Sequence, residues 1–154
     1  MKLARFSLIC LVLVCLLPAA GCSSFNREWR AATARPLPAS AIAGPWTGQW
    51  RSSVNGHQGE LRALFTPVNE ETFHARFRAR FWGIMSYSYS LELTAEPVSP
   101  GQWRIQGESD LGWLAGGVFR CRGMASASFM QATFDSKRDR GTFILSRPTS
   151  EPKS

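Results

Sequence analysis

Apolar and polar residues alternate along residues 72–93. Phe73, Phe77 and Phe81 share one phase with alanines, arginines occupy the other phase, and the alternation resumes after Trp82 and Gly83. A helix would scatter these side chains around its circumference, whereas successive residues of a strand face opposite sides. The pattern therefore predicts two consecutive strands, each with one apolar face.

Similar alternation, interrupted by turn signals, runs from Gly44 to Pro148. Asn55 and Gly56 form a strong hairpin signal, so we expect a strand from Gly44 to pair with one over residues 58–66. Further strands are expected near residues 103–113, 118–125, 128–134 and 141–147. Short connections and the absence of a helical pattern in this region predict an all-β fold, a single small antiparallel up-and-down barrel of about eight strands, because closure removes exposed edges. An open two-layer sandwich is the alternative.

The first 21 residues have a different composition. Lys2 and Arg5 precede an apolar run over residues 6–17, which is shorter than the roughly 20 residues of a membrane-spanning helix. This order predicts a signal peptide over residues 1–21.

Small residues stand directly before a cysteine at positions 18–22, Pro-Ala-Ala-Gly-Cys. This segment resembles the lipobox of bacterial lipoproteins cleaved by signal peptidase II. The resemblance implies that Cys22 becomes the first residue and carries acyl chains that anchor the protein in a membrane. Ser23, in place of Asp, implies sorting to the outer membrane, with the domain facing the periplasm. An ordinary signal peptide cut near Ala20 is the alternative.

Residues 22–43 are rich in Ala, Pro, Arg and Ser. We expect a flexible tether, either with a short helix from Asn26 to Ala34 or as a disordered spacer. Trp29 is expected at the membrane interface. Residues 44–148 form the barrel domain, and residues 149–154 are expected to be a disordered tail.

The chain is basic, with a formal net charge of +7, which falls to +5 when Lys2 and Arg5 are removed with the signal peptide. Such a charge suits anionic lipid head groups or polyanionic envelope polymers, and export argues against nucleic acid as a partner. Five arginines form the candidate basic surface patch: Arg76, Arg78 and Arg80 on one strand, and Arg120 and Arg122 on another. The patch is either a solvated outer face or a surface that binds an anionic envelope component.

Gly44, Pro45 and Trp46 open the predicted barrel, and Arg147 ends it. This arrangement resembles that of the lipocalins and related calycins, in which a Gly-x-Trp on the first strand packs beneath a basic side chain from the closing strand. The resemblance implies a barrel closed by Gly44, Trp46 and Arg147 that binds a hydrophobic small molecule or a lipid.

Bulky residues on the inward phases are the candidate cavity lining: Trp50, Phe65, Phe73, Phe77, Tyr87, Tyr89, Trp103 and Phe119. Small residues such as Ala75 and Ala79 are interleaved with them, so the interior is either hollow or filled by neighbouring side chains.

Candidate chemistry is sparse. His57 and His74 have no cysteine or carboxylate partners at metal-ligand spacing, so we expect no metal and no cofactor. Turn formation explains Asp135 and Asp139, and Cys121 is expected to be a core residue. The sequence thus favours a non-enzymatic envelope lipoprotein whose barrel binds an apolar ligand, and the alternative is a ligand-free structural or protein-interaction module.

Overall fold

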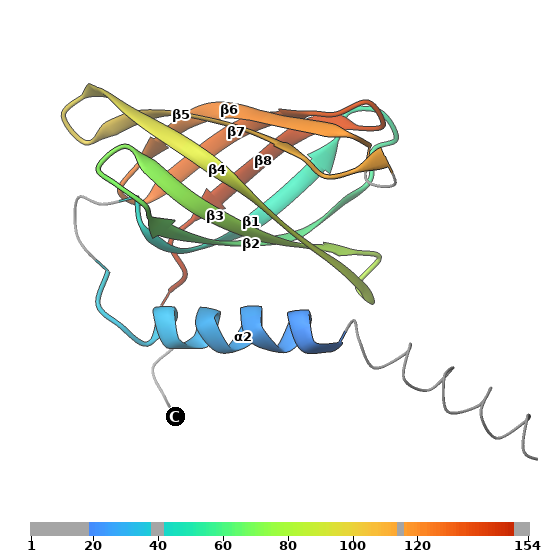
Figure 1. Ribbon diagram of the computed structural model, residues 1–154, viewed down its shortest axis with the longest axis horizontal. Coiled ribbons are helices and arrows are strands. Elements are labelled where there is room, and N and C mark those ends of the chain that lie inside the picture. Colours follow the sequence, from blue (N-terminus) through green and yellow to red (C-terminus); the bar gives the residue numbers. More distant parts are fainter. Residues whose placement is uncertain (1–18, 38–41, 114–115, 150–154) are drawn as a thin grey trace, which may run out of the picture.

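The computed structural model describes residues 19–37, 42–113 and 116–149 (Figure 1). Residues 1–18 of the predicted signal peptide and residues 150–154 of the predicted tail lie outside the described residues. Within the described part of the chain, no helix combines the length and the apolar composition needed to cross a membrane.

Eight strands form a closed barrel in which each strand pairs with the next and β8 pairs with β1, all antiparallel (Figure 1). The strands are β1 Gly44–Ser52, β2 Gln58–Pro67, β3 Thr72–Phe81, β4 Met85–Ser99, β5 Gln102–Asp110, β6 Val118–Ser126, β7 Phe129–Asp135 and β8 Arg140–Ser146. The prediction of an all-β, antiparallel up-and-down barrel is confirmed, and the open sandwich is excluded.

The connection between β1 and β2 is the hairpin expected at Asn55 and Gly56, and β2 begins at Gln58 as predicted. The loop between β1 and β2 spans residues 53–57, because the Ser52 amide bonds the His57 carbonyl and the Asn55 side chain accepts from the His57 amide. Strand β4 continues through Pro97 and ends at Ser99. Its pairing with β5 becomes irregular between Pro97 and Ser99, which is where a strand tolerates a residue without an amide hydrogen.

The two alternating sets of side chains on β3 lie on opposite faces of the strand, as the sequence predicts. Phe73, Ala75, Phe77 and Ala79 are buried inside the barrel, and the intervening arginines lie on its outer surface. Burial of this apolar phase contributes about 25 cal/mol per Å² of surface removed from water, which fixes the register because a slip by one residue would turn arginines inward.

The seam between β1 and β8 closes the barrel tightly at Gly48. A Cβ atom added at Gly48 would collide with the main-chain carbonyl of Ile144, so glycine is required for the two strands to approach. On the mouth side of this contact, Trp50 pairs with Phe143.

The helix α2 (Ala19–Thr33) lies against the outside of the barrel (Figure 1). Phe25 and Trp29, one helical turn apart, are buried against Leu64 on the outer face of β2, and Ala32 continues the same stripe. Of the two alternatives for the tether, the helix is the one observed here; it begins earlier than expected and is packed against the barrel. Trp29 is covered by the barrel surface, so its expected place at a membrane interface is wrong.

Candidate functional site

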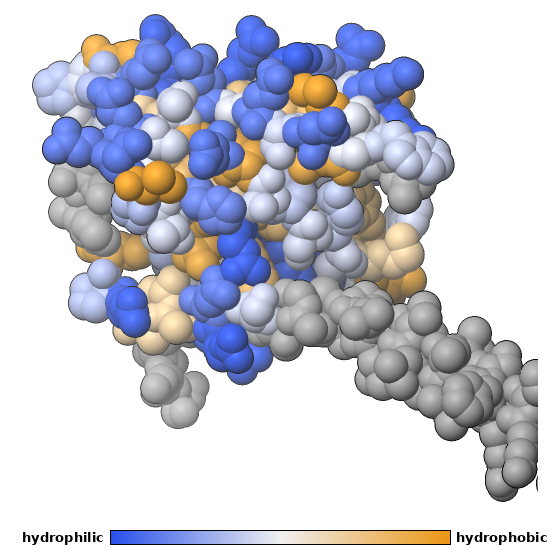
Figure 2. Space-filling view, viewed as in Figure 1, coloured by the Kyte–Doolittle hydropathy of each residue, from blue (hydrophilic) through white to orange (hydrophobic). Residues whose placement is uncertain are grey.

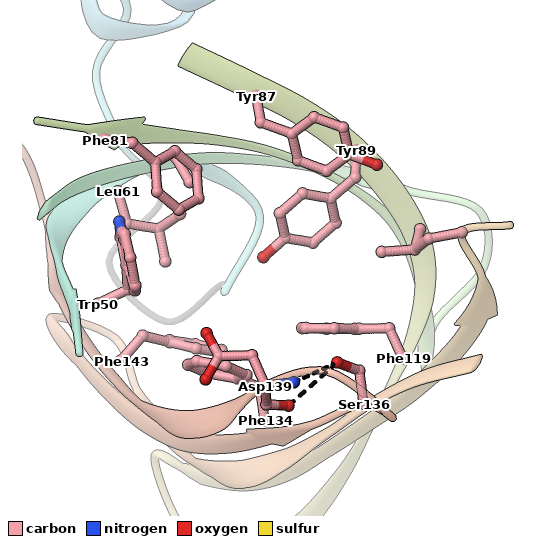
Figure 3. A pocket seen from close by; sticks show the side chains of 12 residues that line it. Trp50, Leu61, Phe81, Tyr87, Tyr89, Phe119, Phe134, Ser136, Asp139 and Phe143 are labelled. Carbon is pink, nitrogen blue, oxygen red and sulfur yellow. Dashed lines mark hydrogen bonds between the residues drawn. The ribbon is translucent and has the colours of Figure 1, made fainter. Parts of the chain in front are cut away.

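A cavity of about 580 Å³ opens at one end of the barrel (Figure 3). We call this end the mouth; it is formed by the loops 53–57, 82–84 and 136–139 and by residues 111–113 and 116–117, at the right of Figure 1. The cavity is lined by Trp50, Leu61, Ala79, Phe81, Tyr87, Tyr89, Leu111, Phe119, Phe134, Ser136, Asp139 and Phe143. Most of the lining is apolar and aromatic, and it comes from every strand except β5, which contributes only through Leu111 just after its end.

The opposite end of the barrel, which we call the floor, is filled. Trp46 is completely buried there, and its indole nitrogen donates to the carbonyl of Ile42 over 2.8 Å. The guanidinium of Arg147 stacks on the Trp46 ring, with Cζ 3.8 Å from the ring centroid. Leu93, Ile105, Met130 and Leu145 complete the packing. The barrel is therefore solid at the floor and hollow at the mouth.

A connected set of aromatic rings forms one wall of the cavity. Tyr89 stacks on Phe77 below it with a centroid separation of 5.1 Å and contacts Phe119 at 5.3 Å. Phe119 in turn stacks on Phe134 at 5.9 Å. On the other side, Trp50 contacts Phe81 at 4.7 Å and its indole donates to the Arg80 carbonyl over 3.2 Å. These ring contacts join residues of β1, β3, β4, β6 and β7 around the cavity.

Tyr89 places a hydroxyl within this apolar wall. Figure 3 shows the phenol pointing into the cavity. Burial raises the pKa of Tyr89, and the neighbouring Cys121 and Tyr87 add to the effect, so the phenol stays protonated. Among the described residues no hydrogen bond joins this hydroxyl to another protein group, and it can donate to a bound molecule.

Ser136 and Asp139 are the polar side chains at the rim of the cavity. The Asp139 carboxylate accepts from the Ser52 hydroxyl over 2.6 Å and from the Arg140 amide over 2.8 Å. The Ser136 hydroxyl donates to the Asp139 carbonyl over 3.0 Å (Figure 3). These bonds shape the β7–β8 turn, as expected for Asp139, and they also hold a carboxylate at the cavity edge.

The predicted lining residues separate into two groups. Trp50, Tyr87, Tyr89 and Phe119 line the cavity. Phe65, Phe73 and Phe77 are buried in the filled part of the core, and Trp103 is only partly buried and packs against that core away from the cavity. The two small inward residues of β3 also differ. Ala79 lines the cavity, whereas Ala75 is packed in the filled part of the core.

The predicted lining omitted Leu61, Phe81, Phe134, Phe143 and the residues that reach the cavity from loops. Phe81 and Phe143 lie on inward phases, so alternation was a usable signal for both. Leu111, Ser136 and Asp139 lie between strands, where no periodicity indicates a direction.

The five arginines of the predicted basic patch do not form one surface. Arg76 pairs with Glu28 of α2 and bonds Ser24, and Arg78 donates to Asn26 over 2.9 Å. The remaining members are Arg80, which pairs with Glu60, Arg120, which pairs with Glu108, and Arg122, which is exposed on β6. Because β4 and β5 separate β3 from β6, the patch is divided, and the part on β3 is largely a binding face for the protein's own helix.

Leu64 is the residue from which the contact between α2 and β2 could have been predicted. It is an aliphatic residue on the outer phase of β2, where the neighbouring outward positions are charged or polar. Phe25, Trp29 and Ala32, spaced as one helical stripe, were the matching signal on α2.

Cys121 is buried on β6, and burial raises the pKa of its thiol to about 12, against a weaker opposing hydrogen bond from the Gly107 backbone. The thiol is therefore protonated at neutral pH. Among the described residues, no group of three or more His, Cys, Asp and Glu side chains is placed to hold a metal ion. The backbone of Cys22 lies in the first turns of α2.

No protein-family model matches this chain, and neither does any curated protein. Among solved structures, the chain is similar to a de novo designed fluorescence-activating β-barrel. The TM-score is 0.47 and the sequence identity 19%, over 74% of this chain and 100% of the designed one.

Proposed function

We propose that this protein is a non-enzymatic bacterial envelope lipoprotein whose barrel binds a small hydrophobic or lipid ligand. Acyl chains on Cys22 hold it at the outer membrane, on the periplasmic side. The observation that carries the ligand-binding part is the cavity at the mouth above a packed floor.

The size and lining of the cavity fit such a ligand. Pockets for small molecules are typically about 300–1,000 Å³, mostly apolar, with a few polar groups that fix orientation. The cavity of about 580 Å³ lies within this range, and the Tyr89 hydroxyl supplies a hydrogen-bond donor on its wall. An acyl chain or a compact aromatic molecule with one acceptor atom has the matching chemistry.

The lipid anchor is supported by the segment 18–22 and by the position of Cys22 at the start of a helix that packs on the domain. Metabolic labelling with palmitate tests it. Label is expected on the wild-type chain and not on Cys22→Ser; continued labelling of Cys22→Ser would show that the proposed anchor is wrong.

The cavity is tested with the protein purified from the membranes of cells that express it. Native mass spectrometry is expected to show a co-purified small molecule, and added fatty acid is expected to quench tryptophan fluorescence through Trp50. Absence of both signals would contradict the proposed ligand.

Two pairs of variants locate the binding. Ala79→Phe places a ring in the cavity and should abolish quenching, whereas Ser88→Phe on the outer face of β4 should leave it intact. Tyr89→Phe removes the hydroxyl that faces the cavity and should weaken binding about fivefold, since a neutral hydrogen bond contributes about 1 kcal/mol. Tyr87→Phe removes the hydroxyl of the other tyrosine of the lining, whose side chain is 42% exposed, and should weaken binding less than Tyr89→Phe does.

A further inference from the structure

Large apolar side chains are exposed on the loops at the mouth. Trp82 and Ile84 on the β3–β4 turn are 65% and 86% exposed, and Trp113 on the β5–β6 loop is 77% exposed. We call these three residues the mouth rim. In Figure 2, hydrophobic surface is visible at the lower right of the barrel, where the β3–β4 hairpin projects. Solvent-exposed tryptophans beside an open cavity indicate a surface that contacts something apolar.

The backbone at Trp82 is strained. Its φ is +49°, in the left-handed region, and the following Gly83 has φ +73°, with the Ile84 amide bonding the Phe81 carbonyl over 3.2 Å. This combination of signs belongs to a type I′ turn, for which Asn or Gly is favoured at the first position and a bulky aromatic residue is costly. Trp82 is thus kept at a position where folding alone favours another residue.

The two ends of the barrel differ in charge. At the floor end, the β2–β3 loop carries Glu70 and Glu71. At the mouth, the loops 53–57 and 82–84 contain no acidic residue. The β7–β8 loop carries Lys137 and Arg138 beside Asp139, and Asp135 and Asp110 end the strands β7 and β5 at the same end. The charge at the mouth is mixed, but the loop that contacts Trp82, through His57, carries no acidic residue. Exposed tryptophans with no acidic side chain on the adjoining loop favour the head-group region of a phospholipid bilayer.

Helix α2 points toward the same end. Its early residues Asn26 and Ser24 bond Arg78 and Arg76 of β3, and Figure 1 shows its N-terminal end on the side of the mouth. Chains attached to Cys22 would then enter a membrane that faces the mouth. The place of the acyl chains rests on the proposed lipid anchor, whereas the exposure of the mouth rim and the backbone at Trp82 do not depend on it.

We propose that the mouth rim docks on the surface of a phospholipid bilayer, with Trp82, Ile84 and Trp113 in the interface. The cavity then opens onto the lipid, and a hydrophobic ligand passes between bilayer and barrel without crossing water. The floor, with its acidic loop, faces away from the membrane.

The test uses the protein purified from its own membranes and reconstituted into nanodiscs of phosphatidylcholine and phosphatidylglycerol. Lipids brominated at shallow acyl positions are expected to quench its tryptophan fluorescence. The variant Trp82→Ser with Trp113→Ser should lose at least half of that quenching. The control variant Val68→Ser with Phe129→Ser removes exposed apolar side chains at the floor end and should retain it.

No quenching of the wild-type protein, or equal quenching of the rim variant, would overturn the proposal. A concentration-dependent dimer that is lost in the rim variant would also overturn it, because the rim would then bind a second copy. Far-UV circular dichroism checks that both variants are folded. The mass of the purified protein shows whether acyl chains are attached, and the fatty-acid assay shows whether the cavity binds a ligand. Failure of the proposed function can therefore be told apart from failure of membrane docking.

Discussion

Arg147 lies over the ring of Trp46, with the guanidinium carbon 3.8 Å from the ring centroid, and joins the last strand to the first. Its Nη1 donates to the carbonyls of Ala43 and Pro45, and its Nε donates to the carbonyl of Ala127. Burial lowers the pKa of Arg147 to about 10, so the side chain is charged at neutral pH. One side chain thus covers the floor and bonds three backbone carbonyls.

Replacing this guanidinium should destabilise the barrel. In Arg147→Lys, an ammonium group cannot stack on Trp46 and reach carbonyls on both sides. We expect the free energy of unfolding to fall by about 2 kcal/mol, in the range of hydrogen bonds to charged groups. Urea denaturation measures it. Arg122→Lys, at an exposed position on β6, should change it by less than about 0.5 kcal/mol, and equal effects of the two variants would contradict the role given to Arg147.

The packing of α2 depends on Leu64. Leu64→Ser removes the apolar contact beneath Phe25 and Trp29, which stabilises the docked helix by about 1.5–3 kcal/mol. We expect trypsin to cleave after Arg27 and Arg30 about tenfold faster or more, while the barrel keeps its thermal midpoint. Ile144→Ser alters an exposed aliphatic residue on the outer face of β8 and is the control. Unchanged cleavage in Leu64→Ser would mean that the polar contacts alone hold the helix.

Trp82 should show a conflict between stability and docking. Trp82→Asn places a residue that tolerates positive φ in the turn, so the free energy of unfolding should rise by about 1 kcal/mol. The same variant should lose part of its quenching by brominated lipids. Trp113→Asn is the control: its backbone is not in the left-handed region, so it should lose quenching without gaining stability. A loss of stability in Trp82→Asn would be inconsistent with strain at this turn.

Cys121 should make stability fall at alkaline pH. The folded state keeps the thiol proton up to a pKa of about 12, whereas the unfolded chain releases it above the ordinary value of 9.0. The unfolded state therefore gains relative stability as pH rises through this window, by about 1 kcal/mol between pH 8 and pH 10. Urea unfolding at both pH values measures the change, which should be smaller in Cys121→Ala. An equal decline in the two proteins would assign the effect to other groups.

The alternation of side chains was sufficient to predict the strands and their faces. In β3, Phe73 and Phe77 face inward and Arg76 and Arg78 outward because only one face of a strand can be buried without burying charge. The short connections between strands, with Arg147 following the last one, were enough to predict closure. Both features depend on the order of residues along the chain, so they can be predicted without knowing the tertiary structure.

Only the tertiary structure decided where the barrel is hollow and what covers its outer face. The inward Phe and Ala residues have the same pattern at both ends of the barrel. At the floor, the Trp46 side chain fills the interior, whereas at the mouth the Trp50 ring packs against Phe81 and leaves the cavity open. Arg76 and Arg78 look like solvated residues until Glu28 and Asn26 of α2 are placed against them. Cavity volume and helix docking depend on distances between residues far apart in the chain, and periodicity carries no information about such distances.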